Sequence, residues 1–361
     1  MSPNMAVVCI DAGAGSTASI GAGLLEDASQ FLTSPSGRFL LFSSDGSAPA
    51  AARVRRALAG SLLADLSLDD REESKTLESV KRIADAAIEA GVRRDDAFVA
   101  VGGGVVSDIV GFAAAIVLRG VAWNAVPTTT GSMTDAAIGG KTGVDTAAGK
   151  NLVGAFHPPR TILIDPTTLE TLSDRDYRAG LVEGFKAAWI ADSELADRSE
   201  KRIDALLARE ADALLDLIAG AVAVKAAIVS ADLREGDRRR LLNFGHTLGH
   251  AFEAAGGYRD LKHGEAVAWG IAAALPISAR RAALDPAASQ RVRNALARLG
   301  PFPAPDRDPR MLASFLARDK KATARGLAGV VLERVGRARV EEAIPIEEWL
   351  EAAADTKIGN R

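Results

Sequence analysis

The stretch Asp96-Ala97-Phe98-Val99-Ala100-Val101-Gly102-Gly103-Gly104-Val105-Val106-Ser107-Asp108 contains the pattern that decides the fold. An apolar run predicts a buried strand, which stops at three glycines before a helical pattern begins. Glycines at such a turn let backbone N–H groups approach a pyrophosphate, and the following helix N-terminus favours the anion. Ser107 replaces the third glycine of Gly-x-Gly-x-x-Gly, so a tight turn without a ligand is the alternative.

Similar apolar runs lie on both sides of this turn. Strands are predicted at 38–42, 96–101, 122–126 and 161–165, and apolar residues spaced near 3.6 predict a helix over 75–90. Alternation of short strands with helices is typical of a parallel α/β sheet.

Beyond about residue 177 the pattern changes to amphipathic helices. Nearly all of 179–231 is helix-forming, and the same holds for 241–255, 265–283 and 287–299. Pro301, Pro303 and Pro305 predict a loop. A length of 361 residues suits two domains. We therefore expect an α/β domain at 1–177 and an all-helical domain at 178–361, with a ligand site in the cleft between them.

Composition narrows the class of protein. The chain is 48% hydrophobic and 25% charged, with a net charge of −3, which argues against nucleic acid or an anionic membrane as the main partner. A single cysteine excludes an intrachain disulfide and fits a reducing compartment. No secretory signal is visible, and the apolar runs are interrupted before the ~20 residues that a membrane helix needs. These features predict a cytoplasmic protein.

The histidines are the most informative residues. There are four, and three of them, His246, His250 and His263, fall within one short segment. His246 and His250 are four apart, so in a helix both rings project from one face. Imidazoles are good ligands for zinc or a similar ion, with a carboxylate as a usual third ligand. The alternative is a pair of structural histidines. Thr247 occupies the position of the general base in His-Glu-x-x-His, which argues against a zinc peptidase.

Polar and basic residues gather in loops rich in glycine and threonine, at 127–135, 139–143 and 149–151. Gly-Lys pairs and hydroxyl groups suit phosphate and carboxylate oxygens, although a solvated hairpin is the simpler interpretation. The Gly-x-x-x-x-Gly-Lys pattern of a P-loop is missing. Glu183 and Lys186 lie three apart on one helical face, and as a lone pair they would form a surface ion pair worth little.

Taken together, these segments resemble 3-dehydroquinate synthases from about residue 70 to residue 336. Several linked motifs in the right order are far more specific than any one of them. The motifs are Gly102–Asp108, Asp135–Asn151, Gly180–Lys186, Arg234–Gly236, Leu242–His250, His263–Glu265 and Asp319–Lys321.

The resemblance implies a dinucleotide-binding first domain and a metal- and substrate-binding second domain, and it implies a role for each matched residue. The metal, zinc or cobalt, would be held by Glu183, His246 and His263. NAD would contact Asp45, Glu72, Lys75, Gly103, Gly104, Val105, Asp108, Thr128, Thr129, Asp135, Lys141, Lys150, Thr171 and Leu172. The substrate would contact Lys141, Asn151, Lys186, Lys225, Arg239, Asn243 and Lys320 or Lys321, with His250 beside it as a proton relay. Arg119 would reach the neighbouring subunit's site, which implies a homodimer.

The implied reaction converts a sugar-acid phosphate, 3-deoxy-D-arabino-heptulosonate 7-phosphate, into a carbocycle. Transient oxidation by NAD acidifies a neighbouring C–H, phosphate leaves, the hydride returns and an intramolecular aldol addition closes the ring. The alternatives are another sugar-phosphate cyclase, of the 2-epi-5-epi-valiolone or 2-deoxy-scyllo-inosose synthase type, an iron-dependent alcohol dehydrogenase-like enzyme, and a binding protein that has lost catalysis.

Overall fold

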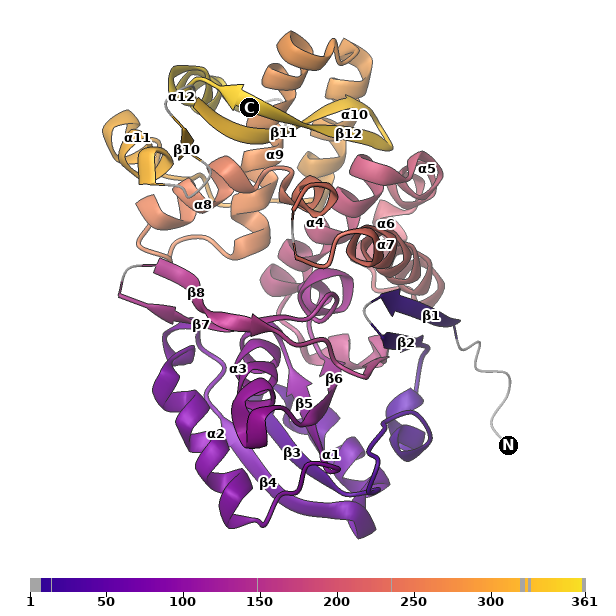
Figure 1. The fold of residues 1–361 in the computed structure, drawn as a ribbon. Helices are drawn as coiled ribbons and strands as arrows, with labels where there is room; N and C mark the ends of the chain where they lie inside the picture. Colours follow the sequence, from indigo (N-terminus) through magenta and orange to yellow (C-terminus); the bar gives the residue numbers. More distant parts are fainter. Residues whose placement is uncertain are drawn as a thin grey trace. The chain divides into compact units, whose positions relative to one another are not determined.

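The computed structural model describes residues 8–13, 15–147, 149–234, 236–318, 322–323 and 326–358 (Figure 1). The chain divides into two compact units, 1–172 together with 225–233, and 173–224 together with 234–361. The first unit thus ends before the boundary expected from the sequence and also takes in a short segment around the end of helix α7 (Ala211–Ala231).

A seven-stranded sheet organises the first unit, in the order β1-β2-β9-β6-β5-β3-β4, and all neighbouring strands are parallel except β1 and β2. The strands are β1 (Val8–Gly13), β2 (Ser16–Ile20), β3 (Phe39–Ser44), β4 (Leu62–Leu68), β5 (Ala97–Gly102), β6 (Ala122–Pro127) and β9 (Thr161–Ile164). The helices are α1 (Ala48–Ala57), α2 (Leu77–Glu89) and α3 (Gly104–Ile116). The four predicted strands and the predicted helix are confirmed.

The order of the strands creates a switch point between β3 and β5. From β3 the chain moves outward to β4 and then returns to the other side of β3 as β5. Loops at the carboxyl ends of parallel strands diverge at such a point, where ligands of open α/β sheets bind. The three-glycine turn lies there, because β5 ends at Gly102 and α3 begins at Gly104.

The polar loops rich in glycine form a separate hairpin, β7 (Lys141–Thr146) paired with β8 (Gly149–Phe156). Short helical turns complete this unit: η1 (Leu24–Gln30), η2 (Asp45–Ser47), η3 (Ala59–Ser61), η4 (Glu72–Ser74), η5 (Val117–Arg119), η6 (Ser132–Ala136) and η7 (Pro166–Thr171).

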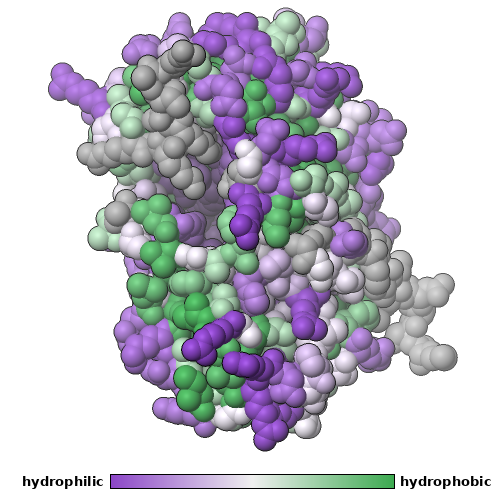
Figure 2. All heavy atoms as spheres, in the orientation of Figure 1, coloured by the Kyte–Doolittle hydropathy of each residue, from purple (hydrophilic) through white to green (hydrophobic). Residues whose placement is uncertain are grey.

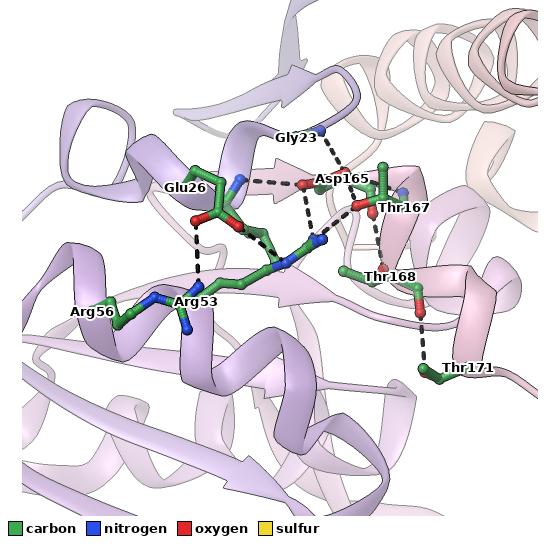
Figure 3. Close-up of polar contacts among 9 residues, drawn as sticks. Gly23, Glu26, Arg53, Arg56, Asp165, Thr167, Thr168 and Thr171 are labelled. Atoms are coloured by element: carbon green, nitrogen blue, oxygen red, sulfur yellow. Dashed lines mark hydrogen bonds and ion pairs between the residues drawn. The ribbon is translucent and has the colours of Figure 1, made fainter.

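A buried carboxylate fixes the turn η7 to the sheet (Figure 3). Asp165, fully buried after β9, accepts hydrogen bonds from the backbone N–H groups of Gly23 at 2.9 Å, Leu25 at 3.2 Å and Thr167 at 3.1 Å. Arg53 of α1 donates to Thr167 Oγ1 at 2.8 Å and lies 3.6 Å from Asp165 Oδ2. This arrangement links three separate segments at the start of η7.

The second unit is mainly helical, as predicted. Its elements are α4 (Asp174–Ala191), α5 (Ser193–Lys201), α6 (Ile203–Leu207), the first part of α7 (Ala211–Ala231), η8 (Arg238–Asn243), α8 (His246–Ala255), α9 (His263–Ala282), α10 (Pro286–Leu299), α11 (Pro309–Arg318) and α12 (Ile346–Asp355). Helix α9 is central, because α4, α8, α10, α12 and a strand all pack against it. Pro301–Pro305 is a loop, as expected.

The all-helical prediction for this unit needs one correction. Three antiparallel strands, β10 (Ala322–Thr323), β11 (Gly326–Arg334) and β12 (Arg337–Ile344), form a small sheet. Val335 and Gly336, with a positive φ of 83°, make the two-residue turn between β11 and β12. Trp349 of α12 and residues of α8, α9 and α11 cover this sheet in one apolar core.

One helix of the described residues, α7, is long and apolar enough by length and composition to cross a membrane. In its most apolar window 56% of the residues are buried inside the protein, including Leu217, Ile218 and Val222. Core helices pass the same test, so this observation alone does not indicate a membrane protein.

Candidate metal centre and surrounding residues

Three helices of the second unit bring the predicted ligands together. Glu183 lies within α4, His246 is the first residue of α8 and His263 is the first residue of α9. His263 Nε2 is 3.6 Å and His246 Nε2 is 4.0 Å from Glu183 Oε1. Tetrahedral donors about 2.1 Å from an ion lie about 3.4 Å apart, so these three groups are spaced to share one cation.

Glycines allow these helices to approach closely enough. A Cβ at Gly264 would lie 1.9 Å from the carbonyl oxygen of Ala179 on α4, and one at Gly270 would lie 1.8 Å from the carbonyl oxygen of Gly245. Gly245 has a φ of 80°, which glycine adopts at little cost and which lets α8 begin at His246. The position of His263 beside Glu183 and His246 therefore depends on backbone contacts that a larger residue would prevent.

The carboxylate of Glu183 is suited to a cation. Glu183 is 3% exposed. Among the described residues no donor forms a hydrogen bond with its Oε1. Its Oε2 forms an ion pair with Lys186 Nζ. A buried carboxylate oxygen without a partner is costly, and metal coordination is one way to satisfy it. The interpretation of Glu183 and Lys186 as a surface pair is wrong, since Lys186 is only 1% exposed.

The imidazoles are oriented with Nε2 toward the carboxylate. The carbonyl oxygen of Phe244 lies 3.2 Å from His246 Nδ1 and can only accept, so this contact assigns the proton to Nδ1 and leaves Nε2 free for coordination. Burial and the positive charge of Lys186 lower the pKa of His246 well below its ordinary value. His246 is therefore neutral near pH 7, as a metal ligand must be.

The electrostatics of His263 are different. Loss of water around the ring would by itself lower the pKa of His263, but the charge and hydrogen bond of Glu253, together with the charge of Glu183, raise this pKa to about 9. Metal binding at Nε2 would have to displace a proton. His250 lies beside both rings, with centroids 5.3 Å from His246 and 5.9 Å from His263. Glu253, which the sequence analysis missed, lies on the same face of α8 as His246 and His250, at positions i, i+4 and i+7.

The other residues predicted for this unit occupy η8 or fall outside the described part. Arg239, in η8, is 2% exposed, and Asn243 ends the same turn three residues before His246, where α8 begins. Lys320 and Lys321 lie outside the described residues.

The residues predicted to contact NAD all belong to the first unit. Several follow its parallel strands: Asp45 follows β3, Glu72 and Lys75 follow β4, Gly103, Gly104, Val105 and Asp108 follow β5, Thr128 and Thr129 follow β6, and Thr171 and Leu172 end the turn after β9. Parallel strands end at one edge of a sheet, so these residues gather there. Lys141 and Lys150 lie in the hairpin, Asp135 in η6 and Arg119 in η5.

Polar contacts connect these residues to the hairpin. Lys75 Nζ lies 2.6 Å from Asp108 Oδ2 and also donates to Asn151 Oδ1. Asn151 has a positive φ of 55° and its backbone N–H donates to Asp145 at 2.8 Å. Lys150 Nζ is 3.0 Å from Glu72 Oε1. Lys75, which is predicted to contact NAD, therefore forms a hydrogen bond with Asn151, which is predicted to contact the substrate.

Lys225, in the part of α7 that groups with the first unit, donates to the carboxylate of Asp135 at 2.7 Å and to its carbonyl oxygen at 2.5 Å. Lys225 is 6% exposed. The structure thus pairs two residues that the resemblance assigned to neighbouring roles, although they are 90 positions apart.

Comparison with known proteins places these observations in a family. Family models described as 3-dehydroquinate synthase N-terminal and C-terminal match residues 65–179 and 180–322. The 3-dehydroquinate synthase of Solibacter usitatus is 41% identical over 326 residues, which cover 89% of this chain and 91% of that protein. That of Geobacter metallireducens is 43% identical over 270 residues, 74% of this chain and 75% of that protein.

Solved structures show the same fold. The 2-epi-5-epi-valiolone synthase of Streptomyces hygroscopicus, solved with NAD⁺ and Zn²⁺ bound, matches with a TM-score of 0.83 at 30% identity, over 94% of this chain and 95% of that one. A 2-deoxy-scyllo-inosose synthase, solved with carbaglucose-6-phosphate, NAD⁺ and Co²⁺, matches with a TM-score of 0.87 at 24% identity, over 98% of this chain and 100% of that one. The two family models and the relatives that are more than 40% identical show that this chain is an enzyme and that it belongs to the 3-dehydroquinate synthase family.

Proposed function

We propose that this enzyme is a 3-dehydroquinate synthase, which converts 3-deoxy-D-arabino-heptulosonate 7-phosphate into 3-dehydroquinate and inorganic phosphate. Substrate and organic product differ by one molecule of phosphoric acid, which leaves when a carbon–oxygen bond breaks. The enzyme would therefore be a carbon–oxygen lyase that also closes a ring. The product is a precursor in the shikimate route to aromatic amino acids.

The observation that carries this proposal is the convergence of Glu183, His246 and His263 in a chain of this family. Their candidate ligand atoms all lie within 4.8 Å of one another. Three protein ligands leave positions open for substrate, as in catalytic rather than structural zinc sites. Zinc and cobalt both accept this nitrogen and oxygen donor set.

When bound, the metal supplies Lewis acidity to neighbouring substrate hydroxyls, and NAD accepts and returns one hydride, so the conversion involves no net oxidation. The protein's own residues bind and orient the substrate. Lys186 holds Glu183 in place through their ion pair. Its buried ammonium group would also attract an anionic group of the substrate strongly, because charges interact more strongly away from water. Holding one conformer of the open chain favours ring closure over side reactions.

We assign NAD to the edge of the sheet in the first unit, where the predicted contact residues gather. Backbone N–H groups at the start of α3, around Gly103 and Gly104, suit the pyrophosphate. The substrate's phosphate and carboxylate would be bound by cationic and amide side chains, namely Lys141, Asn151, Lys186, Lys225, Arg239, Asn243, Lys320 and Lys321. His250 is the proposed proton relay, because an imidazole titrates near neutrality.

A second candidate function is cyclisation of a sugar phosphate that lacks the carboxylate. The 30% identity to a 2-epi-5-epi-valiolone synthase over most of both chains favours it. The presence of Arg239 favours the carboxylated substrate, since a guanidinium can bind a carboxylate through two parallel hydrogen bonds. An alcohol dehydrogenase-like activity would instead release NADH from a simple alcohol.

The decisive experiment supplies the purified protein with NAD, Zn²⁺ or Co²⁺ and the heptulosonate phosphate, and measures phosphate release and carbocycle formation. We expect both products in equal amounts without net accumulation of NADH. Sedoheptulose 7-phosphate, glucose 6-phosphate and a simple alcohol serve as comparison substrates. Turnover of only a non-carboxylated sugar phosphate would replace the proposal with the second candidate, and NADH released from the alcohol would replace it with a dehydrogenase.

We also propose that the enzyme acts in the cytoplasm as a homodimer in which Arg119 serves the partner's site. Arg119 and Leu118 have positive φ values of 68° and 50°, a strained conformation that functional positions often adopt. Ile116, Leu118, Leu152 and Phe156 expose large apolar side chains on α3, η5 and β8. In Figure 2, green patches with purple side chains between them lie on the left of the first unit.

Complementation tests the shared site. His263→Ala and Arg119→Ala would each be inactive as homodimers, but co-expression would form mixed dimers with one intact site. Random mixing predicts recovery of about one quarter of the wild-type activity. Recovery of no activity from mixed dimers, or a monomer by light scattering, would contradict the assignment.

A further inference from the structure

Glu253 is a buried acid to which no role has yet been assigned. It lies in α8, seven residues after His246, and only 4% of its surface is exposed. The same helix buries Leu248 and Phe252 fully in the apolar core of this unit. A carboxylate in such surroundings is rare unless a hydrogen-bonded or charged partner compensates for the loss of water.

The carboxylate faces a metal ligand from the side opposite to the candidate ion. Glu253 Oε2 lies 3.3 Å from His263 Nδ1, while His263 Nε2 lies 3.6 Å from Glu183 Oε1. The two ring nitrogens of His263 face different carboxylates, Nδ1 toward Glu253 and Nε2 toward Glu183, so the ring lies between them. One of them, Glu183, also faces His246.

His263 needs this support more than His246 does. The side chain of His246 is 10% exposed and its Nδ1 faces a backbone carbonyl, whereas the side chain of His263 is 46% exposed and starts a helix. An exposed ring keeps rotational freedom that binding must remove, unless a fixed acceptor holds it beforehand. Glu253 is itself fixed within a helix.

We propose that Glu253 is a positioning residue of the metal centre. Its carboxylate accepts the hydrogen bond of His263 Nδ1–H, selects the tautomer with a free Nε2 and makes that nitrogen a stronger donor to the ion. This inference rests on the proposed function, because it assumes that Glu183, His246 and His263 hold a catalytic divalent ion. Partners of this kind typically change metal affinity by about 10–100-fold.

The test compares Glu253→Gln, Glu253→Ala and Glu253→Asp with a matched control, Glu200→Gln. Glu200 belongs to the same unit, and its carboxylate is also largely buried, bonding to Trp189 at 2.9 Å and Arg291 at 2.6 Å. It belongs to neither group of side chains that could hold a metal ion. The affinity for Co²⁺ and Zn²⁺ is measured by competition with a chelator, and the ligand field is followed by the absorption spectrum of the Co²⁺ protein.

We expect Glu253→Ala to weaken metal binding about 10–100-fold and Glu253→Gln to weaken it less, because the amide oxygen still accepts a hydrogen bond without the charge. Glu253→Asp should recover part of the affinity. The cobalt spectrum of the alanine variant should shift as the ring reorients. Glu200→Gln should bind metal as the wild type does, whatever its effect on the unfolding temperature.

Three results would overturn the inference. Wild-type metal affinity in both Glu253→Gln and Glu253→Ala would show that the contact has no positioning role. Equal losses in Glu253→Gln and Glu200→Gln would indicate general damage to the unit. A second bound ion, absent from Glu253→Gln and from His250→Ala, would make Glu253 a ligand, since His250, Glu253 and His263 are also close enough to share a cation. These measurements need no substrate, so they are independent of whether the wild type releases phosphate.

Discussion

At the residue scale, the metal centre depends on which atom of each side chain faces the others. His246 and His263 come from different helices, yet both direct Nε2 toward the same oxygen of Glu183. His250 projects from the same face of α8 as His246, but its ligand atoms group with those of Glu253 and His263, whereas those of His246 group with Glu183 and His263. The two histidines of one helical face are therefore expected to differ in role.

Substitution of these histidines separates ligand from proton relay. His263→Ala should abolish both metal retention and turnover, because two ligands cannot hold the ion in a fixed geometry. His250→Ala should keep the metal but slow turnover by about 10²–10⁴-fold, the usual contribution of a positioned acid or base. Metal content and kcat are measured on the same samples. Loss of metal from His250→Ala would show that the division of roles is wrong.

A second residue-scale prediction concerns Asp108 and pH. Burial raises the pKa of Asp108 to about 6 from its ordinary 3.8, although the nearby charge of Lys75 opposes the shift. The folded state thus holds this proton more tightly than the unfolded chain. The resulting contribution to stability is complete below pH 3.8 and is lost as the pH rises through about 6.

Asp108→Asn removes this titration, so its free energy of unfolding should fall less than that of the wild type between pH 4 and pH 7. Denaturant titrations of both proteins across that range measure the difference. Parallel pH profiles would contradict the shift at Asp108.

At the element scale, the site is a consequence of helix packing. Helix α9 touches α4 through Gly264 and α8 through Gly270, and each glycine meets a backbone carbonyl that would exclude a side chain. Such contacts leave no flexible group that could move aside. The distance between the ligands is therefore set by the backbones of three helices and not by side-chain adjustment.

Gly270→Ala tests this dependence. The added methyl group would force α8 and α9 apart, which should lower the free energy of unfolding by about 1–3 kcal/mol and weaken metal binding. Gly60→Ala, where the space around the Cβ is open, is the control and should change neither quantity. Denaturant unfolding and chelator competition measure the two effects. An unchanged metal affinity in Gly270→Ala would mean that helix spacing does not set the site.

At the scale of the whole molecule, we expect the two compact units to have different roles. The predicted NAD residues belong to the first and the three metal ligands to the second. Binding to one unit should stabilise that unit directly, because a ligand that binds only the folded state adds RT ln(1 + [L]/Kd) to its stability.

Zinc or cobalt at about 100 times its dissociation constant should therefore add about 2.7 kcal/mol to the unfolding free energy of the unit that holds it. Calorimetry with metal and with chelator measures the change, and His263→Ala should show none. An equal shift in His263→Ala would place the stabilising metal somewhere else.

The strands and helices followed from local patterns. These elements can be predicted because their patterns are properties of adjacent residues. Examples are the short buried runs Phe39–Ser44 and Ala97–Gly102 and the 3.6-residue periodicity of Leu77–Glu89. The sequence analysis does not predict β11 and β12. Leu327–Leu332 of β11 is a short apolar run that periodicity alone does not distinguish from a helix segment, and β12 carries several charged residues.

The sequence by itself determined the kinds of group available for chemistry: a histidine-poor chain with three histidines in one segment, a glycine turn after a strand, and motifs in the order of one family. Only the tertiary structure decided that Glu183 lies buried beside two imidazoles, that Lys186 shares its burial, and that Glu253 faces His263. Those contacts join residues far apart in the chain, and they arise because glycine-mediated packing of α4, α8 and α9 sets distances that no local pattern encodes.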